Sequence, residues 1–168
     1  MIISNKVLAA LNAQVGMEYE ASLKYDAIGS YFTLEELPQL AKFFFKQSTE
    51  EREHAHKFIK FMLDRDAQVA IPAIPAPPVT FDSPVAAVLE AQASEKKVSS
   101  AIHSLYELAL SEKDHATAIM LQWFITEQVE EESTIRQMLK FVQRGKESGM
   151  MTVEDYLVDA GEGGKSDK

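Results

Sequence analysis

A proline-rich stretch in the middle of the chain limits the possible folds more than any other feature. Residues 66–83 contain Pro72, Pro75, Pro77 and Pro78. Proline fixes φ and removes a backbone donor, so we expect an extended connection here rather than a helix. At roughly 3.3 Å per residue, about 18 extended residues reach farther than the roughly 40 Å of a helix of about 28 residues. The helices on either side can therefore lie parallel, whereas a short turn would force them antiparallel.

Long helical segments flank this connection on both sides. Gly and Pro are few, at 7 and 6 of 168 residues, and the stretches rich in Ala, Leu, Glu, Lys and Gln favour helix over sheet. We expect one all-α domain over 1–168, a four-helix bundle with one long crossover between its second and third helices and a short fifth helix. Start and stop signals place the helices at about 5–32, 38–65, 84–110, 115–144 and 152–160, with a polar, Gly-rich tail at 161–168.

Particular residues define the predicted helix ends. Ser4 or Asn5 can cap the first helix. Pro38 suits the first turn of the second helix, where its missing N–H would be unpaired in any case. Gly145 and Gly149 are predicted to end the fourth helix.

Charge and cysteine content exclude several kinds of function. The 17 Lys and Arg against 26 Asp and Glu give a net charge of −9, which repels nucleic-acid phosphates and anionic membranes. Without Cys, iron–sulfur clusters, thiolate zinc sites and cysteine nucleophiles are excluded. The start of the chain has no leader pattern, and no apolar run approaches the roughly 18 residues that cross a bilayer. We expect a soluble cytoplasmic protein, with no nucleic-acid or membrane partner, that binds cations.

An acidic residue interrupts the apolar stripe of each long helix near its midpoint. One interruption is weak evidence, since that carboxylate could lie at the edge of the bundle in water. Four are stronger, because the midpoints of helices of similar length meet at one level whichever way the helices run. The stripes bring six residues to a common point in the core: Glu18, Glu51, His54, Glu95, Gln128 and Glu131.

Four carboxylates that meet in a core need a positive partner. Burying one unpaired carboxylate costs several kcal/mol, and like charges raise each other's pKa. Two divalent ions would neutralise the four charges, and the spacing of Glu51-x-x-His54 puts both side chains on one helix face. Oxygen ligands with a single imidazole suit iron or manganese better than structural zinc, and iron is the redox-active choice.

At these residues the chain resembles the non-haem bacterial ferritins, which are ferritin-like di-iron carboxylate proteins. The resemblance extends from about Leu11 to the short last helix. Gln128-x-x-Glu131 is similar to ferritin and unlike the second Glu-x-x-His of bacterioferritin. Bacterioferritins bind haem through a Met directly after the bridging Glu, and Arg52 occupies that position here. The resemblance therefore implies iron as the only cofactor, without haem.

The resemblance also implies a role for each residue of the centre. Glu18, Glu51 and His54 would hold one iron. Glu51 would bridge to a second iron, held by Glu95 and Glu131. Two irons per chain would then lie between the four long helices.

Further residues match ferritin positions near this centre. Gln128 would lie on the oxygen-binding side, and Tyr25 would lie close enough to donate an electron or a hydrogen bond. Glu50, Glu127 and Glu130 match the third iron site of bacterial ferritins, although a solvated acidic helix face explains Glu50 and Glu127 equally well.

Two other matches are explained as well by simpler roles. Trp123 matches a ferritin tryptophan, and packing accounts for it. Glu112 and Asp114 are candidates for the channels that admit iron in ferritins, but acidic residues are common in turns.

The resemblance implies an enzyme that stores its product. A ferroxidase would oxidise two Fe(II) with O₂ or H₂O₂ and store the iron as a ferric mineral inside a homo-oligomeric cage of 24 subunits. One alternative is a di-iron peroxidase or oxygenase without storage, similar to rubrerythrins, which usually carry a Cys-rich module that this chain lacks. Another is a scaffold that only sequesters cations, although apolar seams would stabilise a scaffold better. A dimer or a partial shell is an alternative to the cage, since the fifth helix is short.

Overall fold

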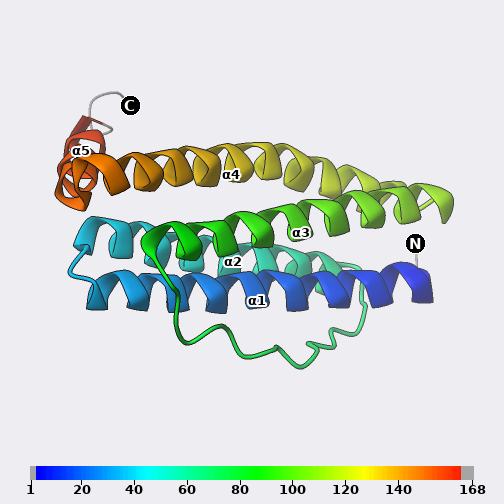
Figure 1. Ribbon diagram of the computed structural model, residues 1–168. Helices are drawn as coiled ribbons and strands as arrows, with labels where there is room; N and C mark the ends of the chain where they lie inside the picture. Colours follow the sequence, from blue (N-terminus) through cyan, green and yellow to red (C-terminus); the bar gives the residue numbers. More distant parts are fainter. Residues whose placement is uncertain (1–2, 164–168) are drawn as a thin grey trace.

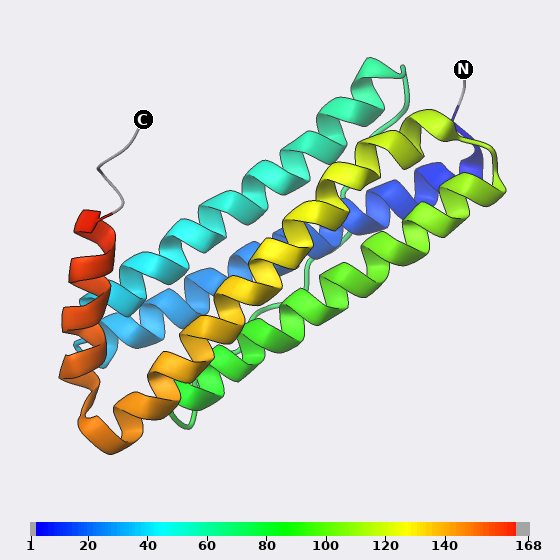
Figure 2. The same ribbon diagram turned by 90° about the horizontal axis from the view of Figure 1, so that it is seen from above.

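The computed structural model describes residues 3–163, and their side chains except at 146–148 and 159–163. Two antiparallel helical hairpins pack into a four-helix bundle, with a fifth helix across one end (Figures 1 and 2). The described elements are α1 (Asn5–Leu34), α2 (Pro38–Asp64), α3 (Pro84–Ser111), α4 (His115–Ser148) and α5 (Met150–Gly163). The predicted all-α four-helix bundle is confirmed.

The proline-rich connection crosses the length of the bundle along the outside of α1, so that α2 and α3 run parallel (Figure 1). Asn12 on α1 fixes it, donating to the Gln68 carbonyl at 3.5 Å and accepting from the Ala70 amide at 2.7 Å. A Cβ at position 16 would come within 2.4 Å of Pro72 Cγ. Gly16 therefore lets the crossover lie directly on the helix.

Side-chain caps begin three of the helices. Ser4 accepts a hydrogen bond from the Val7 amide at 3.3 Å, so Ser4 rather than Asn5 caps α1. Ser83 caps α3, and Asp114 caps α4. Each cap satisfies a backbone donor that has no partner within its own helix.

The predicted end of the fourth helix is wrong by about one turn. α4 continues through Gly145 to Ser148 and ends at Gly149, which has a φ of 93°. A Cβ at position 145 would lie 2.6 Å from Val153 Cγ2, so Gly145 makes room for α5 and does not end the helix. α5 reaches Gly163, and the first part of the predicted tail is therefore helical. Residues 164–168 lie outside the described range.

The apolar core consists of two clusters separated by a polar layer. One cluster contains Leu11, Phe58 and Leu121, and the other contains Phe32 and Phe44. Stacked rings cross the bundle in each, with centroids 4.1 Å apart for Phe58 and Phe124 and 5.5 Å apart for Phe32 and Phe44. Each such buried side chain contributes about 1.5–3 kcal/mol relative to an exposed one. The two clusters fix the four helices on both sides of the polar layer.

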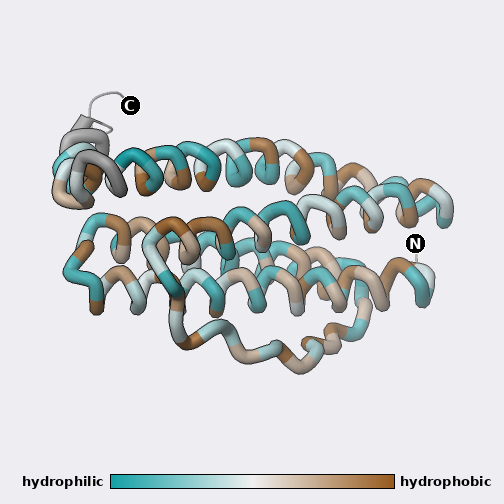
Figure 3. Tube along the Cα trace, in the orientation of Figure 1, coloured by the Kyte–Doolittle hydropathy of each residue, from teal (hydrophilic) through white to brown (hydrophobic). Residues whose placement is uncertain are grey.

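Hydrophilic and hydrophobic residues are mixed along α1, α2, α3 and the coloured part of α4 (Figure 3). Within the described range no helix has an apolar stretch long enough to span a membrane.

A carboxylate from α5 completes the start of α2. The residue before α2 is Leu37, which has no side chain that can cap it. Glu154, 5% exposed, accepts from the Gln39 amide at 2.7 Å and from the Leu40 amide at 3.0 Å. An anion at a helix N-terminus is stabilised both by these unpaired amides and by the helix dipole. Glu154 therefore connects the last helix to the second.

Glu154→Gln is expected to loosen α5. The amide keeps the shape of the side chain but loses the charge and one acceptor, a change worth about 1–2 kcal/mol. Hydrogen exchange of the α5 amides should become roughly tenfold faster, while exchange in the bundle core stays unchanged. Asp155→Asn is the matched control, because Asp155 is the next residue of α5 and its carboxylate is exposed. Equal α5 protection in both variants would show that this contact does not hold the helix.

Candidate metal centre

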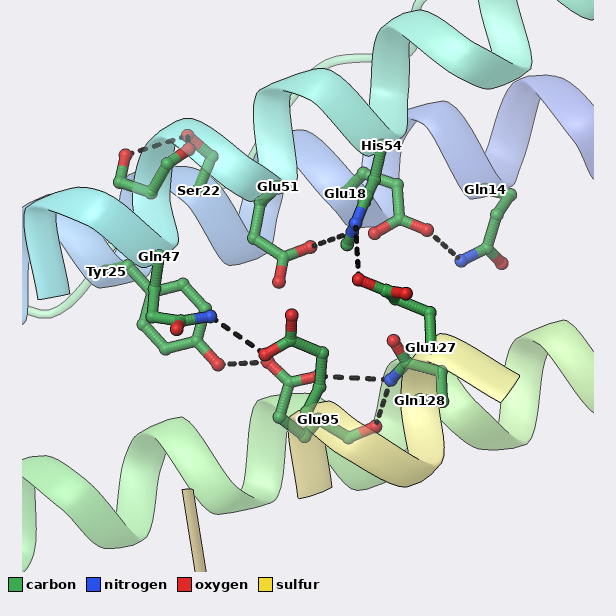
Figure 4. Close-up of polar contacts among 12 residues, drawn as sticks. Gln14, Glu18, Ser22, Tyr25, Gln47, Glu51, His54, Glu95, Glu127 and Gln128 are labelled. Carbon is green, nitrogen blue, oxygen red and sulfur yellow. Dashed lines mark hydrogen bonds and ion pairs between the residues drawn. The ribbon is translucent and has the colours of Figure 1, made fainter. Parts of the chain in front are cut away.

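The polar layer contains all six residues that the stripes place at one point. They come from all four long helices, and their exposed fractions lie between 0% and 7%. In Figure 4, Glu18, Glu51 and His54 from one hairpin face Glu95 and Gln128 from the other across a common space. The residues are Glu18 on α1, Glu51 and His54 on α2, Glu95 on α3, and Gln128 and Glu131 on α4.

On the α1–α2 side of the layer, possible ligand atoms lie close together and some have no hydrogen bond. Glu18, Glu51 and His54 present ligand atoms within 4.8 Å of one another. His54 Nδ1 lies 3.3 Å from Glu51 Oε2. Glu18 Oε2 and Glu51 Oε1 are buried with no hydrogen-bond partner among the described residues. Unsatisfied carboxylate oxygens are rare in a folded core, and here they indicate a position for a cation.

On the α3–α4 side, hydrogen bonds hold the carboxylates. Glu95 accepts from the Tyr25 hydroxyl, and from Gln128 Nε2 at 3.0 Å. Gln128 Nε2 also lies 3.1 Å from Ser99 Oγ. Glu131 Oε2 accepts from Gln47 Nε2 at 2.8 Å. These donors are neutral, so they orient the carboxylates without cancelling their charge.

Two of the donors, Gln14 and Gln47, are not among the site residues that the sequence predicts. Gln14 Nε2 donates to Glu18 Oε1 at 2.9 Å, and both side chains are buried. Gln47 belongs to the apolar stripe of its helix but received no role from the sequence. Each lies four residues before an acid of the centre, Glu18 or Glu51, and therefore on the same helix face. That spacing was the available signal for both.

Burial raises the pKa of every carboxylic acid in the layer. Burial raises the pKa of Glu18 well above the usual range, and the charge of Glu51 is the next cause. Burial likewise raises the pKa of Glu51 well above the usual range, and the charge of Glu95 is the next cause. Burial also raises the pKa of Glu95, and burial followed by the Glu95 charge raises that of Glu131 to about 7. Burial and the Glu95 charge raise the pKa of Tyr25, so its hydroxyl keeps its proton. A divalent ion would compete with these protons for the same oxygens.

The predicted third-site residues differ in where they lie. Glu127 Oε1 lies 4.0 Å from His54 Nε2, and Glu127, His54 and Glu131 form a second group with ligand atoms within 4.8 Å. Glu50 is partly exposed and pairs with Lys46 at 2.9 Å. Glu130 is exposed. The structure thus groups Glu127 with residues of the centre rather than with Glu130, and a third iron position stays a prediction.

Arg52 and Trp123 lie next to the centre and make contacts around it. Arg52 joins α2 to α1, donating to Ser22 Oγ at 3.0 Å and pairing with Asp26. Trp123 is 42% exposed, and its ring meets the edge of His54 at a centroid distance of 5.6 Å. Trp123 therefore contacts a predicted ligand, in addition to packing.

Asp114 is not an open channel residue within this subunit. It is 6% exposed, caps α4 and accepts two hydrogen bonds from Arg65 Nη1 at 2.8 and 2.9 Å. Glu112 pairs with Lys6 at 2.9 Å on the surface. Asp114 is therefore a structural residue at the turn between α3 and α4.

Comparison with known proteins gives the family. The pattern of the ferritin-like domain matches residues 8–144, which include all six residues of the centre. The chain belongs to the ferritin family. The ferritin is 37% identical over 143 residues to a bacterial non-haem ferritin of Staphylococcus epidermidis, covering 85% of this chain and 86% of that one. It is 36% identical over 155 residues to ferritin BfrB of Mycolicibacterium smegmatis, covering 92% and 85%.

Solved ferritin structures have the same fold as this ferritin. An open-pore ferritin from Archaeoglobus fulgidus superimposes with a TM-score of 0.88 at 33% identity, covering 92% of this chain and 97% of that one. A closed form of that ferritin, engineered by mutagenesis, gives 0.88 at 34% identity, covering 92% and 96%. The resemblance to non-haem ferritins is confirmed.

Proposed function

We propose that this ferritin oxidises Fe(II) at the buried centre and stores the ferric product. One observation carries the proposal: four helices bring four buried carboxylates together, and two of the carboxylate oxygens have no partner among the described residues. The family and the names of the relatives support iron storage. Fe(II) is here the substrate and cargo of the protein.

Each residue of the centre has a distinct part in this proposal. Glu18, Glu51 and His54 bind the first Fe(II). Glu51 bridges to the second, which Glu95 and Glu131 bind, while the Gln128 amide keeps Glu95 in place at 3.0 Å. Tyr25 donates a hydrogen bond to Glu95 and so orients this ligand.

The reaction uses both ions together. Two Fe(II) give one electron each, and O₂ takes the two electrons and two protons to leave as H₂O₂. With H₂O₂ as oxidant, the two electrons and two protons yield two waters. The buried ligands of the four helices would hold both ions together, so a two-electron step would need no encounter between free ions. The raised pKa values mean that Fe(II) binding displaces protons from the acids.

We propose a homo-oligomeric cytoplasmic cage of 24 subunits as the storage form. Large apolar side chains are exposed on the isolated subunit, among them Leu34 at 84%, Val79 at 93% and Met151 at 69%. Leu34 and Val79 line one surface pocket together with Phe81, and apolar side chains gathered in this way are typical of contacts between subunits. The Archaeoglobus relatives are described as open-pore and closed forms, terms that apply to a shell.

Sedimentation velocity after slow aerobic addition of Fe(II), in large excess over the centre's capacity, tests storage directly. We expect the iron to sediment with the protein in a dense, cage-sized species. The same addition under argon is the control, and there the iron should stay unmineralised. If the protein stays small and the iron precipitates, storage is wrong, and a di-iron peroxidase or oxygenase without storage becomes the better description.

A further inference from the structure

Glu131 lies at the boundary between two groups of possible ligands. It shares the buried layer with Glu95, and the two residues are 7% and 1% exposed. It also belongs to the outer group with His54 and Glu127, and the Glu127 side chain is 30% exposed. A carboxylate in this position can turn toward the buried ion or toward the outside. Something must select its direction if the second ion is to be held firmly.

A hydrogen bond from Gln47 restrains this carboxylate. Gln47 is 3% exposed, and its Nε2 lies 2.8 Å from Glu131 Oε2. It is on α2, one turn before Glu51, so it connects α4 to the helix that supplies the proposed bridging ligand. The bond occupies one oxygen of Glu131 and leaves the other for an ion.

The chemistry of the donor matters as much as its position. A Lys or Arg here would cancel the charge of Glu131 and compete with a metal ion. An amide N–H fixes the direction of the carboxylate and leaves the negative charge in place. The matching contact on the other side of the layer is Gln14 on Glu18, also an amide, at 2.9 Å.

We propose that Gln47 is a positioning residue that fixes one carboxylate oxygen of Glu131 and so holds the other in place for the second ion. The inference rests on the proposed function, since it assumes that the layer binds two ions. Gln47 sets the affinity for the second ion, while Gln14 sets the affinity for the first. Partners that orient metal ligands typically change metal affinity or activity by 10–100-fold.

Titration with Co²⁺, followed by its visible absorption, tests the proposal with Gln47→Met and Gln14→Met. Methionine keeps the size of the side chain and removes the donor. For Gln47→Met we expect the second ion to bind about tenfold more weakly and the first within about twofold of wild type. Gln14→Met should show the reverse. Gln47→Asn, whose amide is one methylene too short to reach Glu131, should behave like Gln47→Met and replaces it if that variant does not fold.

Aerobic oxidation of Fe(II) gives a second readout. In Gln47→Met the Fe(II) concentration at half-maximal initial rate should rise about tenfold, while the rate at saturation falls less than threefold. Wild-type affinity for both ions would overturn the proposal, as would equal weakening of both ions, which would indicate a general structural role. If the wild-type protein itself binds fewer than two ions or oxidises no Fe(II), the proposed function fails instead.

Discussion

Glu51→Ala is expected to slow the initial aerobic oxidation of Fe(II), at two ions per chain, by about 100-fold or more. Glu51 is fully buried, and its Oε1 has no partner among the described residues. The charge of Glu51 raises the pKa of Glu18 in one half of the layer, and the charge of Glu95 in the other half raises the pKa of Glu51. Removing it therefore takes a ligand from both proposed ions at once. Stopped-flow absorbance of the ferric product measures the rate.

Glu53→Ala is the matched control for this experiment. Glu53 lies on the same helix and carries the same charge, but its side chain is exposed. We expect an oxidation rate within about twofold of wild type. The fold of Glu51→Ala is checked by thermal unfolding of the metal-free protein. That variant should be as stable as wild type, because it loses a buried acid whose pKa is raised. A fast rate in a folded Glu51→Ala protein would mean that this layer is not the catalyst.

Raising the pH from about 5 to about 8 is expected to destabilise the metal-free protein. The folded chain keeps protons on the buried acids at pH values where the unfolded chain has released them. Folded protein therefore binds more protons than unfolded protein, and the free energy of unfolding falls as the pH rises through this window. For Glu131 alone, whose pKa rises from 4.5 to about 7, the loss between pH 5 and pH 8 is about 2.5 kcal/mol. Glu18, Glu51 and Glu95 shift in the same direction.

A redox-inert divalent ion should reverse this dependence. Zn²⁺ binds the ionised carboxylates, so with saturating Zn²⁺ the unfolding temperature should rise between pH 5 and pH 7. The measurement is thermal unfolding with and without Zn²⁺, at fixed ionic strength and protein concentration. Glu131→Gln keeps the shape of the side chain but removes the group that titrates. The unfolding temperature of the metal-free variant should therefore change less with pH near pH 7. A metal-free protein equally stable from pH 5 to pH 8 would contradict the assignment of buried protonated acids.

Helical periodicity accounts for the part of the centre that the sequence predicted. A stripe fixes which face of a helix is buried, and helix length fixes the level of its midpoint. Glu18, Glu51, Glu95 and Glu131 could therefore be brought together without coordinates. The length of the proline-rich connection likewise predicted that α2 and α3 can run parallel, as they do.

Features that depend on contacts between helices were not predictable in the same way. Local patterns predict that Gly145 ends α4, whereas its lack of a side chain makes room for Val153. Glu130 and Glu131 differ by one residue, and only the rotation of α4 in the bundle decides that the first is exposed and the second buried. The burial of Asp114 depends on Arg65, 49 residues away in sequence. Local patterns carry no information about such pairings.

The division of the core into two apolar clusters has a mechanical consequence. Each long helix is held firmly at both ends of the bundle, and its middle passes through a layer of acids that repel one another when ionised. A metal-free subunit should therefore bend most easily at this level. Ions bound between the four helices would stiffen the middle without moving the ends. A shell built from such subunits would become more rigid as it takes up iron, while its outer dimensions stay the same.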